Sequence, residues 1–294
     1  MPGETVSGNN FQTFHGGKGA NQAVAVARLG YPVSMVAKVG DDEFGSRLRN
    51  GLRLAGVDVR AVATAKGTAS GVALIYLDRK GQNSITVVPG ANGRLRPRDL
   101  EKALPLLRSA GMILAQLEVP LETVEYLCAA AHRIHVPLML DPAPARPIRR
   151  KLLRQVTYLT PNESETCTLS DIHGRELNLK TVAEFAQILQ SQGAANVIIK
   201  MGSKGAFVAG ANGLQKMVPA FKVKAVDSTA AGDAFNGGLA VALMQGKSLE
   251  DAVRFGTAVG ALSVTRAGAQ PAMPTARDLN NFLKRHDKAL INAA

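Results

Sequence analysis

The stretch VDSTAAGDAFNGG, residues 226–238, decides how this chain is organised. The alternating run 221–226 predicts a strand, and the apolar run 239–244 predicts a buried helix. Between them lies a turn of small residues whose backbone amides no large side chain covers. A helix start with free N–H groups carries partial positive charge and binds anions. We therefore expect an anion site at Ala230, Ala231 and Gly232.

Asp233 lies in the same turn. A carboxylate at that position could take a proton from a substrate hydroxyl. A base beside an anion site suits phosphoryl transfer, because negative charge develops on the moving phosphoryl group. The alternative is that Asp233 only caps the helix, as Asp often does.

The length allows about two domains, but α/β folds often run this long as one, and we expect a single domain over residues 1–294. A hydrophobic content of 46% is ample for a packed core. Cys128 and Cys167 lie in different segments without a metal-like spacing, which indicates a reducing compartment. The first fifteen residues are polar, and no apolar run reaches membrane-spanning length. We expect a soluble cytoplasmic protein with no membrane partner.

The formal net charge is +12. No aromatic residues interleave the densest basic cluster, and no zinc-finger or RNP1-type motif accompanies it, so a solvated helix face is favoured over a nucleic-acid site. That cluster is Arg146, Arg149, Arg150, Lys151 and Arg154.

A second glycine-rich stretch, HGGKGANQ at 15–22, precedes a small-residue helix predicted over 23–30. Its glycines let the backbone approach a ligand closely, and Lys18 and Asn21 offer hydrogen-bond donors. Gln22 stands where a dinucleotide fingerprint needs its third glycine, and no Gly-Lys-Ser/Thr ends the stretch as in a Walker A loop. A glycine-rich turn that merely caps the helix is the alternative.

Periodicity predicts strands at 33–39, 112–116, 137–140, 156–159 and 196–200, a strand pair at 71–77 and 84–88, and helices at 41–55, 100–107, 121–135 and 180–192. Strands alternate with helices from about residue 112, which is typical of a mostly parallel sheet covered on both faces. Ligands bind beyond the carboxyl ends of such strands, so the polar motifs that follow them could converge on one cleft.

Two weaker signals have both a structural and a functional interpretation. His132 and His135 are three residues apart, but without acidic or cysteine partners nearby we interpret them as surface histidines rather than metal ligands. Glu163 and Glu165 follow Asn162 at a strand-to-helix turn. They either stabilise the helix start or hold Mg²⁺ near phosphates.

Taken in order, these motifs resemble the PfkB family of carbohydrate kinases, and within it the ribokinases. The matching pieces span essentially the whole chain. They are PGETV (2–6), GGKGANQA (16–23), DPAPAR (141–146), PNESE (161–165), GSKG (202–205), DSTAAGD (227–233) with NG at 236–237, and VTRAGAQP (264–271).

The resemblance implies a ribokinase-like three-layer α/β/α fold with a mostly parallel central sheet. It also implies a small β-sheet lid, with strands from about 3–14, 57–65, 71–77 and 84–88, that often serves as a homodimer clasp. The implied reaction is transfer of the ATP γ-phosphate to the 5-hydroxyl of D-ribose. The implied cofactors are Mg²⁺ and a monovalent cation, K⁺.

The resemblance also assigns roles by position. Asp233 would be the base, with Ala230, Ala231 and Gly232 as the anion hole. The sugar would contact Gly17, Lys18, Gly19, Ala20, Asn21, Glu118 and Asp233 itself. The phosphates and Mg²⁺ would be served by Asn162 and Glu165, and the nucleotide by Lys200, Gly202, Ser203, Gly205, Gly232 and Thr257. The cation would bind at Asp227, Thr229, Ser263, Arg266, Gly268 and Ala272, where alanine replaces a residue that often supplies a hydroxyl.

The chain departs from the family at its start. Ribokinases usually begin with a core strand bearing a Gly-Ser-x-Asn-x-Asp pattern that binds sugar hydroxyls, whereas this chain opens at PGET, residues 2–5. We therefore expect the first core strand to be missing, leaving an exposed sheet edge or an unfilled slot. Three functional alternatives stay open: a kinase for another sugar or nucleoside, a catalytically impaired nucleotide- or sugar-binding protein, and a basic nucleic-acid binder.

Overall fold

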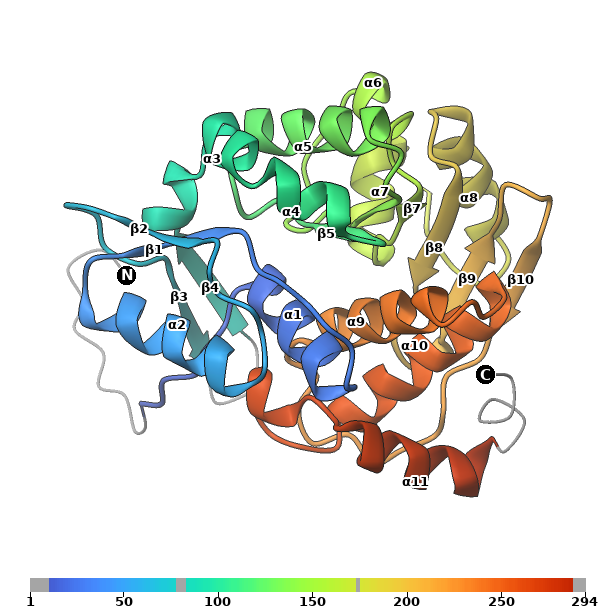
Figure 1. Ribbon diagram of the computed structural model, residues 1–294. Coiled ribbons are helices and arrows are strands. Elements are labelled where there is room, and N and C mark those ends of the chain that lie inside the picture. The colour runs from blue at the N-terminus through green and yellow to red at the C-terminus, as the bar shows by residue number, and fades with distance from the viewer. Residues whose placement is uncertain (1–10, 78–82, 173–174, 288–294) are drawn as a thin grey trace, which may run out of the picture.

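The computed structural model describes residues 11–77, 83–172 and 175–287, and its centre is a six-stranded sheet (Figure 1). The strand order is β10-β9-β8-β7-β6-β5. Strands β5 to β8 run parallel, whereas β9 and β10 are antiparallel additions at one side. The bounds are β5 Ile113–Ala115, β6 Leu138–Leu140, β7 Tyr158–Leu159, β8 Asn196–Lys200, β9 Ala206–Ala209 and β10 Gln215–Val218.

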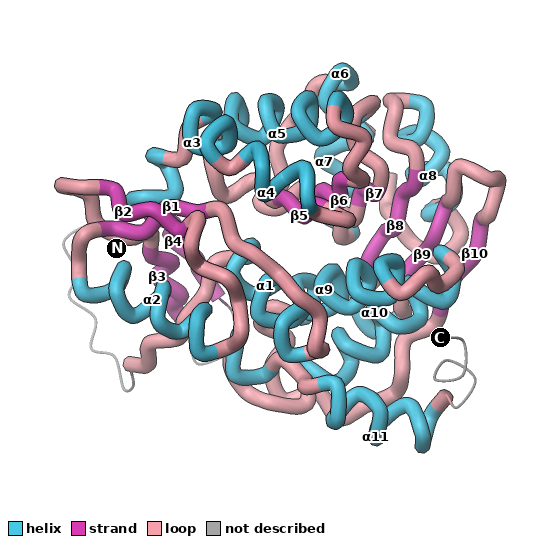
Figure 2. Tube along the Cα trace, viewed as in Figure 1, coloured by secondary structure: helices cyan, strands magenta, loops and turns pink. Residues whose placement is uncertain are grey.

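Helices cover both faces of this sheet, as Figures 1 and 2 show. Successive strand residues point to opposite faces, so each strand contributes to two cores. In β8, Ile198 belongs to the core under helices α1, α9, α10 and α11, and its neighbours Val197 and Ile199 belong to the core under α5, α6 and α8. The first group is α1 Lys18–Arg28, α9 Ala231–Met244, α10 Leu249–Ser263 and α11 Ala276–His286. The second is α5 Leu121–Arg133, α6 Arg150–Leu153 and α8 Val182–Ser191.

Two smaller sheets lie beside this core. Strand β1 (Ala37–Gly40) pairs in parallel with β2 (Val62–Ala65), and β3 (Val72–Leu77) pairs antiparallel with β4 (Asn83–Val88). Among the described residues no strand joins β1 to β5, so β5 ends the six-stranded sheet. The missing first strand itself stays a prediction.

The four-strand lid also stays a prediction. Its first segment lies mostly outside the described residues, and 11–14 form no strand.

The remaining described elements connect the strands and helices named above. They are α2 Glu43–Leu54, α3 Pro97–Lys102, α4 Leu104–Ser109, α7 Glu163–Ser170, and the 3-10 turns η1 Gly90–Arg94, η2 Gly202–Lys204 and η3 Gln270–Ala272. Within the described parts of the chain, no helix is both long and apolar enough to cross a membrane.

Two predicted elements are wrong. Residues 221–226 form no strand. Phe221 packs edge-on against Phe282 of α11 and beneath the Arg254 guanidinium of α10. Phe221 therefore packs against helices rather than extending a sheet edge. The helix predicted over 100–107 is two helices, α3 and α4. Pro105 lies in the first turn of the second, and proline lacks the N–H that a continuous helix would need there.

Helices α1 and α9 begin earlier than the sequence predicts, at Lys18 and Ala231. Lys18, Asn21 and Gln22 are therefore helical. The helix α9 packs closely on two neighbours through glycine: a Cβ at Gly237 would lie 2.6 Å from Ala25 Cβ, and one at Gly238 2.7 Å from Val259 Cγ2. This packing brings the N-terminal ends of α1 and α9 together at the carboxyl ends of the parallel strands.

Candidate active site

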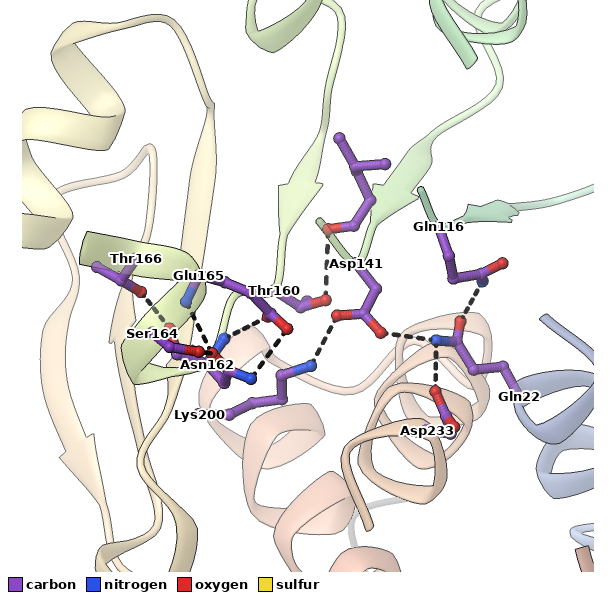
Figure 3. Close-up of polar contacts among 11 residues, drawn as sticks. Gln22, Gln116, Asp141, Thr160, Asn162, Ser164, Glu165, Thr166, Lys200 and Asp233 are labelled. Atoms are coloured by element: carbon purple, nitrogen blue, oxygen red, sulfur yellow. Dashed lines mark hydrogen bonds and ion pairs between the residues drawn. The ribbon is translucent and has the colours of Figure 1, made fainter. Parts of the chain in front are cut away.

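Asp233 lies in the first turn of α9, and its side chain is directed at α1 rather than at its own helix (Figure 3). Its Oδ2 accepts from Asn21 Nδ2 at 2.9 Å, and its Oδ1 accepts from Gln22 Nε2 at 3.2 Å. The residue is only 4% exposed. Among the described residues its carboxylate makes no hydrogen bond to the backbone of α9, so these contacts do not support a purely capping role.

Gln22 connects Asp233 to a second buried carboxylate. Its Nε2 also donates to Asp141 Oδ2 at 3.0 Å, and its Oε1 accepts from Gln116 Nε2 at 2.6 Å. The other oxygen of Asp141 forms a 2.8 Å ion pair with Lys200 Nζ. Figure 3 shows this chain of contacts running from Gln116 through Gln22 and Asp141 to Lys200. We call Asn21, Gln22, Gln116, Asp141, Lys200 and Asp233 the buried network.

Burial raises the pKa of Asp233 to about 6, and repulsion from Asp141 adds to the rise. The positive charge of Lys18 and the hydrogen bonds from Asn21 and Gln22 oppose it. A carboxylate with a pKa near the working pH is well suited to accept a proton during catalysis. The pKa of Asp233 therefore lies in the range that proton acceptance near neutral pH requires.

The glycine-rich stretch before α1 lies against Glu118. The backbone N–H of Lys18 donates to Glu118 Oε2 at 2.8 Å. Burial lowers the pKa of the Lys18 ammonium, but the carboxylates of Asp233, Asp141, Glu118 and Glu165 outweigh it, so the net shift is upward. Lys18 is thus held charged amid acidic groups. Of the seven residues predicted to contact the sugar, Lys18, Asn21, Glu118 and Asp233 make polar contacts here.

Glycine is favoured at two positions of this stretch. Gly17 has φ +91°, a conformation that other residues rarely adopt. A Cβ at Gly19 would lie 2.8 Å from Gln116 Oε1, so any side chain there would push on the buried network. Ala20 makes no polar side-chain contact, since it has no polar group.

The predicted anion site is only partly free. Ala230 has φ +59°, and Ala231 N–H donates to Ser228 O at 3.2 Å, so that amide is engaged within the turn. The amides of Ala230 and Gly232 make no hydrogen bond in the described part of the chain. A Cβ at Gly232 would lie 3.4 Å from Lys200 Nζ, so the free amides and an ammonium share one small region. An anion there would meet three donors.

Asn162 and Glu165 form a reciprocal capping box at the start of α7. Asn162 N–H donates to Glu165 Oε2 at 2.7 Å, and Glu165 N–H donates to Asn162 Oδ1 at 2.8 Å. Burial raises the pKa of Glu165; the charge of Lys200 opposes this and that of Asp141 reinforces it. Glu163 instead pairs with Lys204 at 3.1 Å. The helix-stabilising role is therefore present, and a metal role for Glu165 would be additional to it.

The predicted nucleotide turn is closed by a hydrogen bond from Met201 N–H to Gly205 O at 2.8 Å. Gly202 and Gly205 both have positive φ, and a Cβ at Gly205 would overlap the carbonyl oxygen of Val218. Ser203 lies in this turn and is exposed. Thr257 lies apart on α10, where its hydroxyl donates to Arg254 O at 2.6 Å, and no described hydrogen bond links it to the turn.

Asp227 connects two of the other five predicted cation residues, Thr229 and Gly268. Its two oxygens accept from Thr229 N–H at 2.9 Å and Gly268 N–H at 2.8 Å, and these bonds hold the pKa of Asp227 below its ordinary value despite partial burial. The other predicted residues have local contacts: Ser263 Oγ donates to Gly260 O, Arg266 pairs with Asp278, and Ala272 N–H donates to Ala269 O. No described group of three or more His, Cys, Asp or Glu side chains is arranged for a metal.

Sequence reasoning gave no role to three members of the buried network, Gln22, Gln116 and Asp141. A signal was present for two of them, because Gln116 and Asp141 directly follow strands β5 and β6, where polar residues of parallel sheets meet. For Gln22 the sequence offers only its place beside Asn21. Its bridging of two carboxylates depends on how α1 packs against α9.

Known proteins are similar to this chain in sequence and in fold. A family model described as pfkB family carbohydrate kinase matches residues 2–276. A ribokinase of Bacillus subtilis (strain 168) is 42% identical over 283 residues, which cover 96% of this chain and 92% of that protein. A ribokinase structure from Thermotoga maritima is 40% identical with a TM-score of 0.86, covering 97% of this chain and 92% of that one.

A further solved structure, an Arabidopsis thaliana ribokinase complexed with ribose and ATP, is 33% identical. It has a TM-score of 0.90 and covers 96% of this chain and 91% of that one. The two structural matches confirm the ribokinase-like α/β fold that the sequence predicts.

Proposed function

The chain belongs to the pfkB family of carbohydrate kinases, and on that premise we propose that it transfers the γ-phosphate of ATP to the 5-hydroxyl of D-ribose, giving ribose 5-phosphate and ADP. The family and the similarity to ribokinases make the chain a sugar kinase. The choice of D-ribose and ATP is supported by the Arabidopsis thaliana relative, whose structure is a complex with both.

One observation carries the proposed mechanism: a buried Asp233 carboxylate with a pKa of about 6 lies one residue from a free amide and close to a lysine. The two amide donors, Asn21 and Gln22, fix its orientation without neutralising it. Such an arrangement joins a proton acceptor to a place where developing negative charge is stabilised.

In the proposed step, Asp233 takes the proton of the sugar hydroxyl as the oxygen attacks the γ-phosphorus. The bond from that phosphorus to the bridging oxygen of ADP breaks, and the electron pair leaves with ADP. The amides of Ala230 and Gly232 and the ammonium of Lys200 would stabilise the charge on the phosphoryl oxygens. Lys18, Asn21 and Glu118 would hold the sugar so that its hydroxyl faces Asp233.

Two cations fit residues of this site. Asp141 and Glu165 are buried carboxylates; burial raises the pKa of Glu165 and the charge of Asp141 adds to that rise, and a bound divalent cation would offset both effects. Mg²⁺ usually keeps several waters and binds through one or two carboxylates plus substrate phosphates, where it neutralises phosphate charge. The loops joined by Asp227 would hold K⁺ through backbone carbonyls, together with the other predicted cation residues.

We also propose that a second copy of the chain covers the β3–β4 hairpin. Its exposed apolar residues are Val72, Leu74, Ile75, Tyr76, Val87 and Val88. A concentration of exposed apolar side chains on a two-stranded sheet is typical of an interface rather than of a free surface.

The Asp233→Asn variant tests the reaction. Loss of a general base typically lowers kcat by about 10² to 10⁴-fold, and we expect that loss in a coupled ADP-release assay with D-ribose, Mg²⁺ and K⁺. ATP binding, measured by calorimetry, should change little, because Asp233 contacts no part of the glycine turn 202–205. Asp58→Asn changes a half-buried aspartate on the β1–β2 side that pairs with Arg60; it serves as the matched control and should keep wild-type turnover.

The same assay separates the alternatives. Turnover of Asp233→Asn within tenfold of wild type would overturn the assigned base. Faster turnover with another sugar or a nucleoside would replace D-ribose as the substrate. ATP binding without any ADP release from the wild-type chain would instead identify a non-catalytic binding protein.

A further inference from the structure

A second charged region lies at the ends of β1 and β2, away from the buried network. It is a cavity of about 430 Å³, within the size range of small-molecule sites. Five cations line it, and no acidic side chain does: Lys38, Lys66, Arg94, Arg96 and Arg98. We call this region the basic cavity. It shares no lining residue with the candidate active site.

Among the residues that the structure describes, two of the five cations have an ionic partner. Lys38 Nζ pairs with Asp99 at 2.7 Å, and Arg96 pairs with Glu122 at 2.8 Å. The side chains of Lys66, Arg94 and Arg98 make no hydrogen bond or ion pair within the described ranges, although Arg98 lies near enough to Asp99 to help lower the pKa of that carboxyl. Three positive charges thus converge without compensation.

Hydrogen bonds to neighbouring segments hold the walls of the basic cavity in place. Lys38 Nζ also donates to Arg94 O at 3.0 Å, which fixes η1 to β1. On the other wall, Asp41 Oδ2 accepts from Gly67 N–H at 2.7 Å. Asp42 accepts from both Ser70 N–H and Ser70 Oγ, at 2.8 and 2.6 Å. The loop after β2 and the segment before α3 are therefore pre-positioned, which lowers the entropy cost of binding.

The chemistry of the lining restricts what it could hold. Hydroxyls of Thr64 and Thr68 add polar contacts, but no aromatic ring lines the cavity. A base or sugar face would find nothing to stack on, and single-stranded nucleic acids rely on such stacking. Arginine forks and lysine ammonium groups instead match phosphate oxygens. One phosphate carries about two negative charges at most, so three unpaired cations call for more than one.

From these observations we propose that the basic cavity binds a small molecule bearing two or more phosphate groups, independently of the active site. Arg94, Arg98 and Lys66 would contact the phosphates, and the paired Lys38 would form the floor. The proposal does not depend on the sugar that the active site phosphorylates.

Calorimetry on the full chain tests this, with tripolyphosphate as the probe and ADP at saturation to fill the nucleotide site. We expect one binding event in the wild type that weakens as NaCl rises, because salt screens exposed charges. Arg94→Gln/Arg98→Gln should weaken it at least tenfold. The matched control is Arg150→Gln/Lys151→Gln, which removes two exposed charges from α6 and should stay within twofold of wild type. Circular dichroism checks that both variants fold.

Four results would overturn the proposal. Equal weakening by both double variants would mean diffuse attraction to a basic protein. Loss of the event under saturating ADP would mean that the probe binds the nucleotide site. Orthophosphate binding as tightly as tripolyphosphate would remove the requirement for several phosphates. A single-stranded oligonucleotide that binds more tightly through Arg94 and Arg98 would identify a nucleic-acid site instead.

Discussion

The buried network and the basic cavity both contain charged side chains, but the charges have partners in the first and several lack them in the second. In the buried network Asp141 pairs with Lys200, and Asp233 is held by two amide donors. In the basic cavity Arg94 and Arg98 are exposed and lack an ion pair with any described residue. The difference follows from solvent. An unpaired charge costs several kcal/mol when buried, whereas water and salt weaken repulsion between exposed cations.

This contrast separates two ways of preparing a site. A buried site must satisfy its own charges before a substrate arrives, and it gains control over pKa values by doing so, as Asp233 illustrates. An exposed site can leave its cations free and make new pairs only with the ligand. Substitutions should therefore affect folding strongly in the first region and hardly at all in the second.

The largest effect should come from Lys200→Met. The Asp141 carboxylate, 3% exposed in its side chain, would lose its ionic partner. Breaking one partner of a buried pair typically costs about 3 kcal/mol or more in the free energy of unfolding, which denaturant titration would measure. Adding Asp141→Asn to this variant should restore part of the stability, because the uncompensated charge is then gone. A Lys200→Met protein as stable as wild type would show that the pair is not buried in solution.

An intermediate effect of opposite sign is expected for Asp233→Asn. A pKa raised from 3.8 to about 6 corresponds to about 3 kcal/mol of destabilisation at pH 8. Asparagine has one acceptor where the carboxylate has two, so one lost hydrogen bond returns about 1 kcal/mol of that. The variant should therefore be more stable than wild type by roughly 2 kcal/mol at pH 8.

The pH dependence of this gain provides its control. Above the folded-state pKa of about 6, the wild-type carboxylate is ionised and the full cost is present. As the pH falls below 6 the folded protein protonates Asp233 before the unfolded chain does, so the cost fades and is absent below about 4. Thermal midpoints of the two proteins should converge over that interval. A constant difference between pH 8 and pH 4 would contradict the raised pKa.

The smallest effect should come from Arg98→Gln. Surface substitutions away from special features usually change the free energy of unfolding by less than about 0.5 kcal/mol, and Arg98 is exposed without an ion pair to a described residue. The measurement is a urea titration at low salt, beside the Lys200→Met protein. Destabilisation above about 1 kcal/mol would mean that the arginine has a structural role.

The sequence predicts the architecture well where its patterns are local. Strand 196–200 matches β8, and the alternation of strands and helices from residue 112 gives the parallel sheet. It fails at 221–226, because alternation does not reveal that Phe221 packs on α11. The sequence also misplaces the starts of α1 and α9. Stretches of glycine and alanine are typical of loops, and the sequence does not show the packing against a neighbouring helix that makes these stretches helical.

The candidate site follows the same rule. Asp233, Asn21 and Lys200 are found from motifs, but Gln22 and Gln116 are not, since their roles come from contacts across 94 or more residues of sequence. The sequence likewise does not show that one of the three amides of the predicted anion site, that of Ala231, is already hydrogen-bonded within the turn. Ala231 N–H donates to Ser228 O, and Ala230 between them adopts a left-handed conformation; neither feature has a signature in the sequence.

The three glycines of α9 affect when this helix forms during folding. Gly232, Gly237 and Gly238 lie within fourteen residues, and each glycine costs a helix about 1 kcal/mol relative to alanine. As an isolated peptide this segment would be largely coil. It becomes helical only when α1 and α10 close around it through the contacts at Ala25 and Val259. The Asp233 carboxylate therefore reaches its buried position beside Asn21 and Gln22 only when the tertiary fold forms.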